Sequence, residues 1–282
     1  MESTWIDPAA LIETSAELEA PNLLETTISY SRLRTLQVNG ALTYKRRYLD
    51  GIKDPMTDAQ ILGIATHKKL LEPDTFEEDF IILPKLDRRK TADKAYYEEK
   101  AALALEQRKK LIQDPAVEQA EAMAASVAAH PLVAPLLEGA LKELELKWVK
   151  QATYREQAHQ FNTLAYIDFL NPTLKAMGDL KVVSGTFDPY RFDSKAKREF
   201  YHGQAGLYLD GAASNSIPVE SFHFILVSTK EPYDVALCTC EPEFLERGLA
   251  AAEIATNALY GRLLSNDWLS YPEAIPLRYA PW

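Results

Sequence analysis

The sequence contains very little cysteine and no long apolar run. Its two cysteines, Cys238 and Cys240, are separated by one residue, and two thiols are too few for an iron–sulfur cluster or a structural zinc site. We therefore expect reduced, buried thiols. No apolar stretch reaches the length of a membrane span, and the first residues lack the basic and apolar regions of an export signal. These absences predict a cytoplasmic protein that does not enter a membrane.

Positive charge is also scarce. The chain has 31 Lys and Arg against 41 Asp and Glu, which gives a net charge of −10 at pH 7. Such a field repels phosphate and argues against indiscriminate binding to nucleic acid. It does not exclude a local basic channel, because charges are screened over roughly 8 Å at physiological salt. With 282 residues, the chain can bury one substantial core with an appended subdomain.

Two predicted strands form the centre of the chain. Thr163 to Leu170 and Asp179 to Val183 are rich in β-formers, and Asn171-Pro172-Thr173 breaks the chain between them. Because strand side chains alternate, Asp179 and Lys181 face the same side of the sheet. Aspartate is disfavoured inside strands. Two carboxylates and a lysine in this arrangement therefore suggest a divalent-metal site.

The metal interpretation constrains how these strands pair. A tight turn at Asn171-Pro172 pairs Asp168 with Lys175 and leaves Asp179 roughly 13 Å away. A loop over residues 171–176 instead puts Asp168 directly opposite Asp179, about 5 Å away, which is chelating distance. We predict the longer loop. The alternative is two exposed acids on a solvated sheet face, and spacing alone does not exclude it.

Further candidates lie on the neighbouring segments. Thr57-Asp58 caps a predicted helix that carries His67, with Gly63 one turn earlier on the same face. A lone helix histidine is most often a hydrogen-bonded residue and by itself does not indicate a ligand. Glu143 to Val149 alternates as a strand, and Glu143 can supply a third carboxylate.

We predict one helix from Lys195 to Ala213. Tyr201, Gln204 and Tyr208 fall at i, i+3 and i+7 on one stripe, with Lys197 a turn earlier. Buried helix stripes are normally aliphatic, so this polar and aromatic stripe predicts a face turned towards a groove.

The remaining segments complete the order of elements. We predict a polar arm over residues 1–27 and a single domain over residues 28–282, which starts with a helical N-terminal part. Further predicted elements are helices at 96–108 and 115–141, a polar turn at 150–162, strands at 221–229 and 233–240, and a helix at 242–264. Basic clusters lie at 44–48 and 85–94; they suit phosphate contacts, although such clusters are usually solvated surface. This order predicts an α/β fold with a mixed central sheet flanked by helices.

Four motifs occur together in the order and spacing of a known family: Gly63-Ile-Ala-Thr-His67, Asp168, Asp179-Leu-Lys181 and Gln204-Ala-Gly-Leu-Tyr208. Over about residues 28–282 the chain resembles the RecB-like branch of the PD-(D/E)XK nucleases. Within that branch it resembles the RecE-type 5′→3′ double-strand DNA exonucleases, related to lambda exonuclease. An Asp-x-Lys motif alone is weak evidence, whereas four motifs in register are strong.

The resemblance implies a role for each motif. Asp168 and Asp179 would bind Mg²⁺ or Mn²⁺, and the Leu180 carbonyl and His67 would supply further ligands. Lys181 would orient or help deprotonate the attacking water. Gln204 and Tyr208 correspond to a QxxxY motif placed near the site and the DNA backbone, while Glu143 matches an acidic residue of the first strand more loosely. The family often has proline before the first aspartate, where this chain has Ile167.

The resemblance also implies partners. It predicts action on double-stranded DNA ends in phage-type recombination, a ring-shaped homo-oligomer (trimer or tetramer) and a single-strand annealing partner. The candidate DNA contacts are Arg32, Arg88, Arg89, Lys197 and Tyr201. Two other interpretations stay open. One is a degenerate nuclease fold that binds DNA or a partner protein without cutting, and the other is an endonuclease or a single-strand nuclease.

Overall fold

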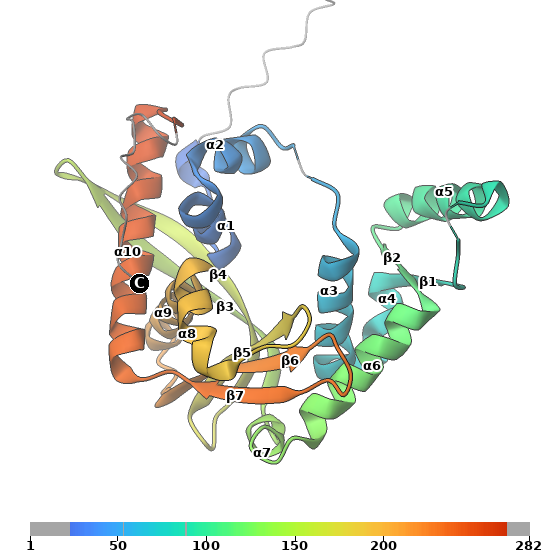
Figure 1. Ribbon diagram of the computed structural model, residues 1–282. Helices are drawn as coiled ribbons and strands as arrows, with labels where there is room; N and C mark the ends of the chain where they lie inside the picture. Colours follow the sequence, from blue (N-terminus) through green and yellow to red (C-terminus); the bar gives the residue numbers. More distant parts are fainter. Residues whose placement is uncertain (1–22, 53, 88, 270–282) are drawn as a thin grey trace, which may run out of the picture.

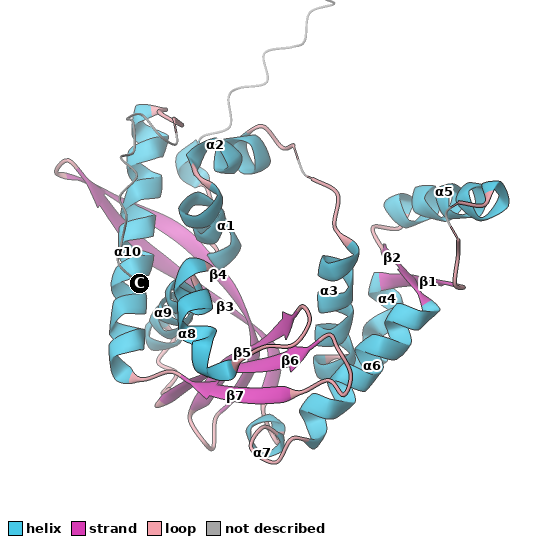
Figure 2. Ribbon diagram, in the orientation of Figure 1, coloured by secondary structure: helices cyan, strands magenta, loops and turns pink. Residues whose placement is uncertain are grey.

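A five-stranded mixed sheet in the order β3-β4-β5-β6-β7 forms the centre of the computed structural model, which describes residues 23–52, 54–87 and 89–269 (Figure 1). Within this sheet β5 and β6 pair in parallel, and the other neighbouring strands pair antiparallel. Helices lie on both sides of the sheet (Figure 2). The predicted fold class is therefore confirmed. The strands are β3 Leu141–Tyr154, β4 Gln157–Asn171, β5 Ala176–Val183, β6 Ser221–Ser228 and β7 Val235–Thr239.

A long hairpin of β3 and β4 replaces the polar turn predicted at residues 150–162. The strands pair as far as Tyr154 and Gln157, which leaves Arg155 and Glu156 as the turn. Both turn residues have positive φ, 46° and 66°, as the two-residue turns that match the twist of a hairpin require. The polar residues here belong to an exposed sheet face, so polarity alone was a poor indicator of a loop.

The connection between β4 and β5 follows the longer loop. Asn171 pairs with Ala176, and the same antiparallel register continued by three residues brings Asp168 beside Asp179. The side-chain oxygen of Asn171 accepts two backbone N–H bonds inside the loop, at 3.1 and 3.0 Å. An asparagine at this position therefore stabilises the turn that sets the register.

Two helices cover one face of the sheet, α9 (Tyr201–Ser214) and α10 (Pro242–Ser265). They cross at Gly206 and Gly248, where a Cβ added to Gly206 would lie 2.2 Å from the Gly248 carbonyl carbon. Only glycine allows the two backbones to approach so closely. The larger hydrophobic core lies between these helices and the strands, and Phe222 is fully buried in it.

The single helix predicted from Lys195 to Ala213 is in fact two helices. Helix α8 covers Phe192–Arg198, and α9 begins at Tyr201. Between them Phe200 has a left-handed φ of 63° and is buried. No glycine or proline marks this break in the sequence. We attribute it to the burial of the Phe200 ring. As a result Lys197 lies on a different helix from the Gln204 stripe.

The other face of the sheet is covered by α3 (Asp58–Leu71), α6 (Asp114–Ala129) and α7 (Ala134–Leu137). Thr57 and Gln60 form a reciprocal capping box that fixes the start of α3. A second hydrophobic cluster joins these helices to the sheet and includes Leu180 of β5. Because Leu180 is turned to this face, strand alternation turns Asp179 and Lys181 to the opposite one.

The N-terminal part is helical, as predicted. A short 3-10 turn, η2 (Leu23–Glu25), precedes α1 (Tyr30–Arg34), η3 (Thr35–Asn39), α2 (Ala41–Tyr44) and η4 (Lys45–Leu49). The basic side chains of η4 pair with Asp50 and Asp54, so this cluster has acidic partners of its own. The predicted arm falls mainly on residues 1–22, which lie outside the described residues.

A small parallel sheet of β1 (Phe80–Leu83) and β2 (Lys110–Gln113) was not anticipated as a sheet. Along the chain, η5 (Pro73–Thr75) and α4 (Phe76–Asp79) precede β1, and α5 (Thr91–Glu106) lies between β1 and β2. Helix α5 stands away from the central sheet in Figure 1. The 3-10 turn η6 (Pro189–Arg191) precedes α8. Among the helices of the described residues, none is long and apolar enough to cross a membrane.

Candidate active site

Helix α3 brings His67 against the central strands. The Nδ1 atom of His67 lies 2.8 Å from the carbonyl oxygen of Gly63, and Nε2 lies 2.9 Å from the carbonyl oxygen of Leu180. Nε2 also lies 3.2 Å from Oδ2 of Asp168. Both ring nitrogens face acceptors, and these contacts favour the protonated ring over the neutral one. Burial alone would lower the pKa of His67, but the charges of Asp168 and Asp179 raise it to about 9.

Asp168 is buried at the end of β4 that faces this histidine. Its Oδ2 accepts a hydrogen bond of 2.6 Å from the backbone N–H of Leu180. Burial opposes ionisation, yet His67 and this backbone bond outweigh it and lower the pKa of Asp168. Asp168 is therefore a buried carboxylate that stays ionised.

Asp179 is buried too, and it has different partners. Gln204 on α9 donates its side-chain N–H to Oδ1, and the Lys181 ammonium lies 2.7 Å from Oδ2. That ammonium also donates to Oε1 of Gln204 at 2.7 Å, and Gln204 donates to the Tyr208 hydroxyl at 3.1 Å. Burial, followed by the charge of Asp168, raises the pKa of Asp179 to about 6. Gln204 thus holds both members of the Asp179–Lys181 pair.

Glu143 joins the same electrostatic neighbourhood from β3. Its φ is 48°, and the pairing of β3 with β4 passes from Lys142 to Leu144 without it. Burial and the nearby charge of Asp168 raise its pKa to about 7. Glu143 is therefore near enough to Asp168 for the two charges to interact, and its role as a third carboxylate stays a prediction.

The two aspartates influence each other's ionisation, but each has its own contacts. Asp168 faces His67 and Leu180, whereas Asp179 faces Lys181 and Gln204. Over the described ranges, no three His, Cys, Asp or Glu side chains are arranged to hold one metal ion. The convergent atoms at His67 are one imidazole nitrogen, one carboxylate oxygen and one backbone carbonyl oxygen.

The basic residues that the sequence suggested as DNA contacts lie on separate elements of the structure. The Arg32 guanidinium lies 4.8 Å from the centre of the Tyr48 ring, on the side of α1 that faces α2 and η4. Arg89 is an exposed residue before α5 and pairs with Asp87, and Lys197 is an exposed residue of α8 that pairs with Asp193. Arg88 lies outside the described residues. These four contacts stay predictions.

Two residues that the sequence did not single out lie beside the candidate site. The hydroxyl of Tyr30 donates to the Glu199 carbonyl at 3.3 Å, and the Arg34 guanidinium donates to the Glu199 carboxylate. Tyr30 feels the charge of Asp179, and Arg34 interacts electrostatically with Tyr30 and Tyr201. Their i, i+4 spacing on α1 was the available signal, since such residues share one helix face.

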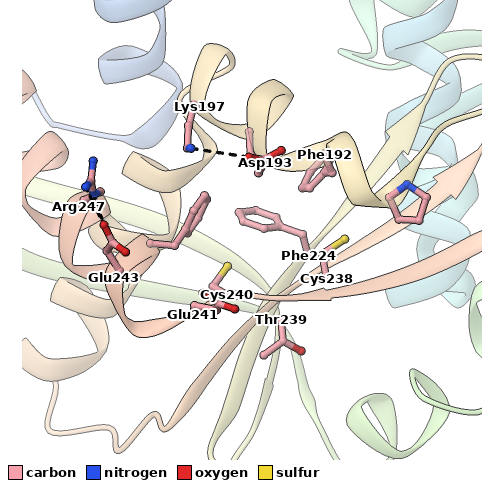
Figure 3. A pocket seen from close by; sticks show the side chains of 13 residues that line it. Phe192, Asp193, Lys197, Phe224, Cys238, Thr239, Cys240, Glu241, Glu243 and Arg247 are labelled. Carbon is pink, nitrogen blue, oxygen red and sulfur yellow. Dashed lines mark hydrogen bonds and ion pairs between the residues drawn. The ribbon is translucent and has the colours of Figure 1, made fainter.

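The hollows of the surface distinguish the site from a neighbouring pocket. One hollow of about 560 Å³ is lined by Gly63, His67, Leu180 and Lys181 among others. A pocket of about 500 Å³ between α8, β7 and α10 contains none of these four residues (Figure 3). Figure 3 shows that its two cations, Lys197 and Arg247, are paired with acids. We therefore place the chemistry in the first hollow.

The same pocket contains both cysteines, with Cys238 and Cys240 near Phe224 (Figure 3). Both are free and partly buried. Burial is the main reason that the pKa of Cys240 rises to about 12. The two cysteines are thus free thiols, and they are partly buried where full burial was expected.

A mixed sheet that carries an aspartate on one strand and Asp-x-Lys on the next is the arrangement of the PD-(D/E)XK class. Residues 41–261 match the model of the family described as a PDDEXK-like domain of unknown function (DUF3799). The chain belongs to this family. No curated protein matches the chain.

Solved structures add a fold comparison. The chain is similar to a protein of Eubacterium rectale that is named as a candidate exonuclease, with 13% identity and a TM-score of 0.58 over 90% of this chain and 88% of that one. At this identity the likeness shows the fold alone. The match to a structure named SSO0001 spans 75% of this chain and 87% of that one at 12% identity, with a TM-score of only 0.29.

Proposed function

We propose that this protein is a metal-dependent DNA exonuclease that hydrolyses phosphodiester bonds at the ends of linear duplex DNA, with 5′→3′ polarity. The family and the fold support a nuclease. The observation that carries the proposal is the convergence of His67, Asp168 and the Leu180 carbonyl beside the pair formed by Asp179 and Lys181. The polarity and the preference for duplex ends come from the resemblance to RecE-type enzymes.

The donor atoms around His67 suit a hard divalent cation. The Leu180 oxygen and Asp168 Oδ2 lie 2.9 and 3.2 Å from His67 Nε2. Neighbouring ligands of an octahedral ion with bonds of about 2.0–2.1 Å are separated by about 3 Å. In addition, Asp179 Oδ2 is buried and has no hydrogen bond, although the Lys181 ammonium is its neighbour. We propose His67, through an Nε2 atom that gives up its proton, together with Asp168, Asp179 and the Leu180 carbonyl as the ligands of Mg²⁺ or Mn²⁺, with Glu143 as a further carboxylate.

Each residue around the proposed metal site would have a separate role in hydrolysis. When bound, the cation polarises a phosphoryl oxygen and lowers the pKa of a bound water. Lys181 adds positive charge where negative charge accumulates in the transition state. Gln204 fixes Lys181 and Asp179 relative to each other, and Tyr208 orients Gln204. The Gly63 carbonyl holds Nδ1 of His67 and so presents Nε2 to the site.

DNA would approach this site along the face that carries α1 and the start of α9. On this face we propose Arg34 as a phosphate contact. The contacts expected from the sequence, Arg32, Arg88, Arg89 and Lys197, stay part of the proposal. A local group of cations can attract the DNA backbone despite the net charge of −10, since screening confines each field to a short range. We also propose a homo-oligomeric ring and a single-strand annealing partner in phage-type recombination, both on the resemblance.

Digestion of end-labelled linear duplex DNA tests this function. Purified protein with Mg²⁺ should release nucleotides from the 5′ end, and EDTA should stop the release. Closed circular DNA should stay intact. Degradation of the circle would favour an endonuclease, and a preference for single strands would favour a single-strand nuclease. Binding of the duplex without any cleavage would favour a DNA-binding protein on the nuclease fold.

A further inference from the structure

Three aromatic rings surround the ammonium group of Lys181. Its Nζ atom lies 4.3 Å from the centre of the Tyr201 ring, 5.6 Å from that of Tyr30 and 5.7 Å from that of Phe224. The Lys181 side chain is only 15% exposed. All three separations are within the range of about 6 Å over which a cation is attracted to an aromatic face.

Each ring reaches this position from a different element. Phe224 is the direct cross-strand neighbour of Asp179 in the parallel pair of β5 and β6. Tyr201 starts α9, three residues before Gln204, so both side chains lie on the face towards Lys181. Tyr30 starts α1 and packs edge-on against Tyr208, with ring centres 6.4 Å apart. The rings are therefore held by the sheet and by two helices.

The rings also brace one another. The Tyr201 ring lies 5.7 Å from the Phe224 ring and 5.9 Å from the Phe192 ring, which in turn lies 5.9 Å from Phe224. Phe192 and Phe224 form part of the wall of the pocket in Figure 3. Tyr201 is thus supported from behind and has little freedom to move away from Lys181.

We propose that Tyr201, assisted by Tyr30 and Phe224, is a positioning residue that holds the Lys181 ammonium in place for phosphodiester hydrolysis. Gln204 accepts one of the three N–H groups of this ammonium, and the Asp179 carboxylate forms an ion pair with it at 2.7 Å. If Asp179 turns to a cation or to substrate, Lys181 loses one of these anchors. The rings carry no charge that a metal or phosphate would attract, so their hold persists. This inference rests on the proposed function, and it differs from the expectation that Tyr201 contacts DNA.

Progressive fluorination of the ring at position 201 tests the proposal. Tyr201→Phe, followed by phenylalanines with one, two and three ring fluorines at this position, keeps the shape and weakens the attraction for a cation in steps. We expect kcat on linear duplex to fall at each step, by about 10-fold or more in total, since a desolvated cation–aromatic contact contributes up to about 2 kcal/mol. KM should stay constant. The same series at Tyr190, which is 94% exposed, is the matched control and should leave kcat unchanged.

The outcomes separate the possible roles of Tyr201. A kcat that does not change along the series would overturn the proposal, and a KM that rises while kcat holds would assign Tyr201 to DNA binding instead. A second measurement does not depend on activity. The Lys181 Cε protons should show an upfield ring-current shift in the NMR spectrum of the wild-type protein, and Tyr201→Leu should reduce it, because Tyr201 is the nearest of the three rings. If no DNA is cleaved but this shift is present, the proposed function fails and the aromatic contact stands; if the shift is absent, the contact itself is refuted.

Discussion

The ion pair between Arg34 and Glu199 provides a test in which two substitutions should act in opposite directions. The Arg34 guanidinium donates to the Glu199 carboxylate, and the side chains are 32% and 24% exposed. If Arg34 contacts a DNA phosphate, the Glu199 carboxylate competes with that phosphate for the Arg34 guanidinium. Glu199→Gln should then tighten the binding of duplex DNA, whereas Arg34→Gln should weaken it.

The exposure of the pair sets the expected magnitudes. A partly exposed ion pair contributes about 0.2–1 kcal/mol, so releasing Arg34 from Glu199 should lower Kd by at most about fivefold. Loss of a hydrogen bond to a charged group costs about 1.5–3 kcal/mol, which raises Kd about 10- to 150-fold. Arg34→Gln should also reduce the slope of log K against log salt by about 0.9, because one phosphate contact is lost.

Fluorescence anisotropy of a labelled duplex, measured over a salt series in EDTA, gives both quantities without cleavage. Arg247→Gln is the matched control, since it removes the same charge from another ion pair between an arginine and a glutamate, Arg247 and Glu243 of α10. It should change the salt slope less than Arg34→Gln. If Glu199→Gln and Arg34→Gln both weaken binding, the pair is a structural link between α1 and the end of α8, and the phosphate contact is refuted.

Three further predictions concern the pair of Asp179 and Lys181, the helix crossing and the thiols. Asp179→Asn and Lys181→Met should each reduce Mg²⁺-dependent degradation by at least about 100-fold with an unchanged circular dichroism spectrum; undiminished activity in folded Asp179→Asn would exclude its catalytic role. Gly206→Ala should lower the free energy of unfolding by about 1–3 kcal/mol, because the new Cβ would clash with the backbone of α10. Gly63→Ala should raise it by about 0.5–1 kcal/mol, because a Cβ there meets open space and alanine favours the helix. Urea unfolding measures both changes, and equal effects would contradict the packing argument. Because the pKa of Cys240 is raised to about 12, its alkylation rate in a Cys238→Ser variant should keep rising above pH 9, whereas a plateau near pH 9 would show an ordinary thiol.

Short-range chemistry made much of the fold readable from the sequence. The capping pair of Thr57 and Gln60, the break at Asn171-Pro172 and the alternation around Leu180 all act within a few residues, so α3, the β4–β5 loop and the faces of β5 were predictable. The order of elements then limited the sheet to a mixed α/β arrangement. For the site, the requirement that two carboxylates approach each other selected the longer loop.

Elements whose form depends on distant packing were predicted less well. The two helices α8 and α9 appeared as one, because the break at Phe200 depends on where its ring is buried. The hairpin of β3 and β4 appeared as a polar turn, because its exposed face resembles a loop in composition. In both cases the local residues permitted two conformations, and contacts with other parts of the chain selected one.

The sequence by itself therefore determined the α/β class and the identity of the acidic, basic and amide groups that could carry the chemistry, since these follow from periodicity and side-chain type. Only the tertiary structure decided their partners. His67 contacts Asp168, and Asp179 contacts Lys181 and Gln204. The rings of Tyr30, Tyr201 and Phe224 surround the Lys181 ammonium. Such contacts join residues far apart along the chain, and their geometry is set when the sheet and helices pack together.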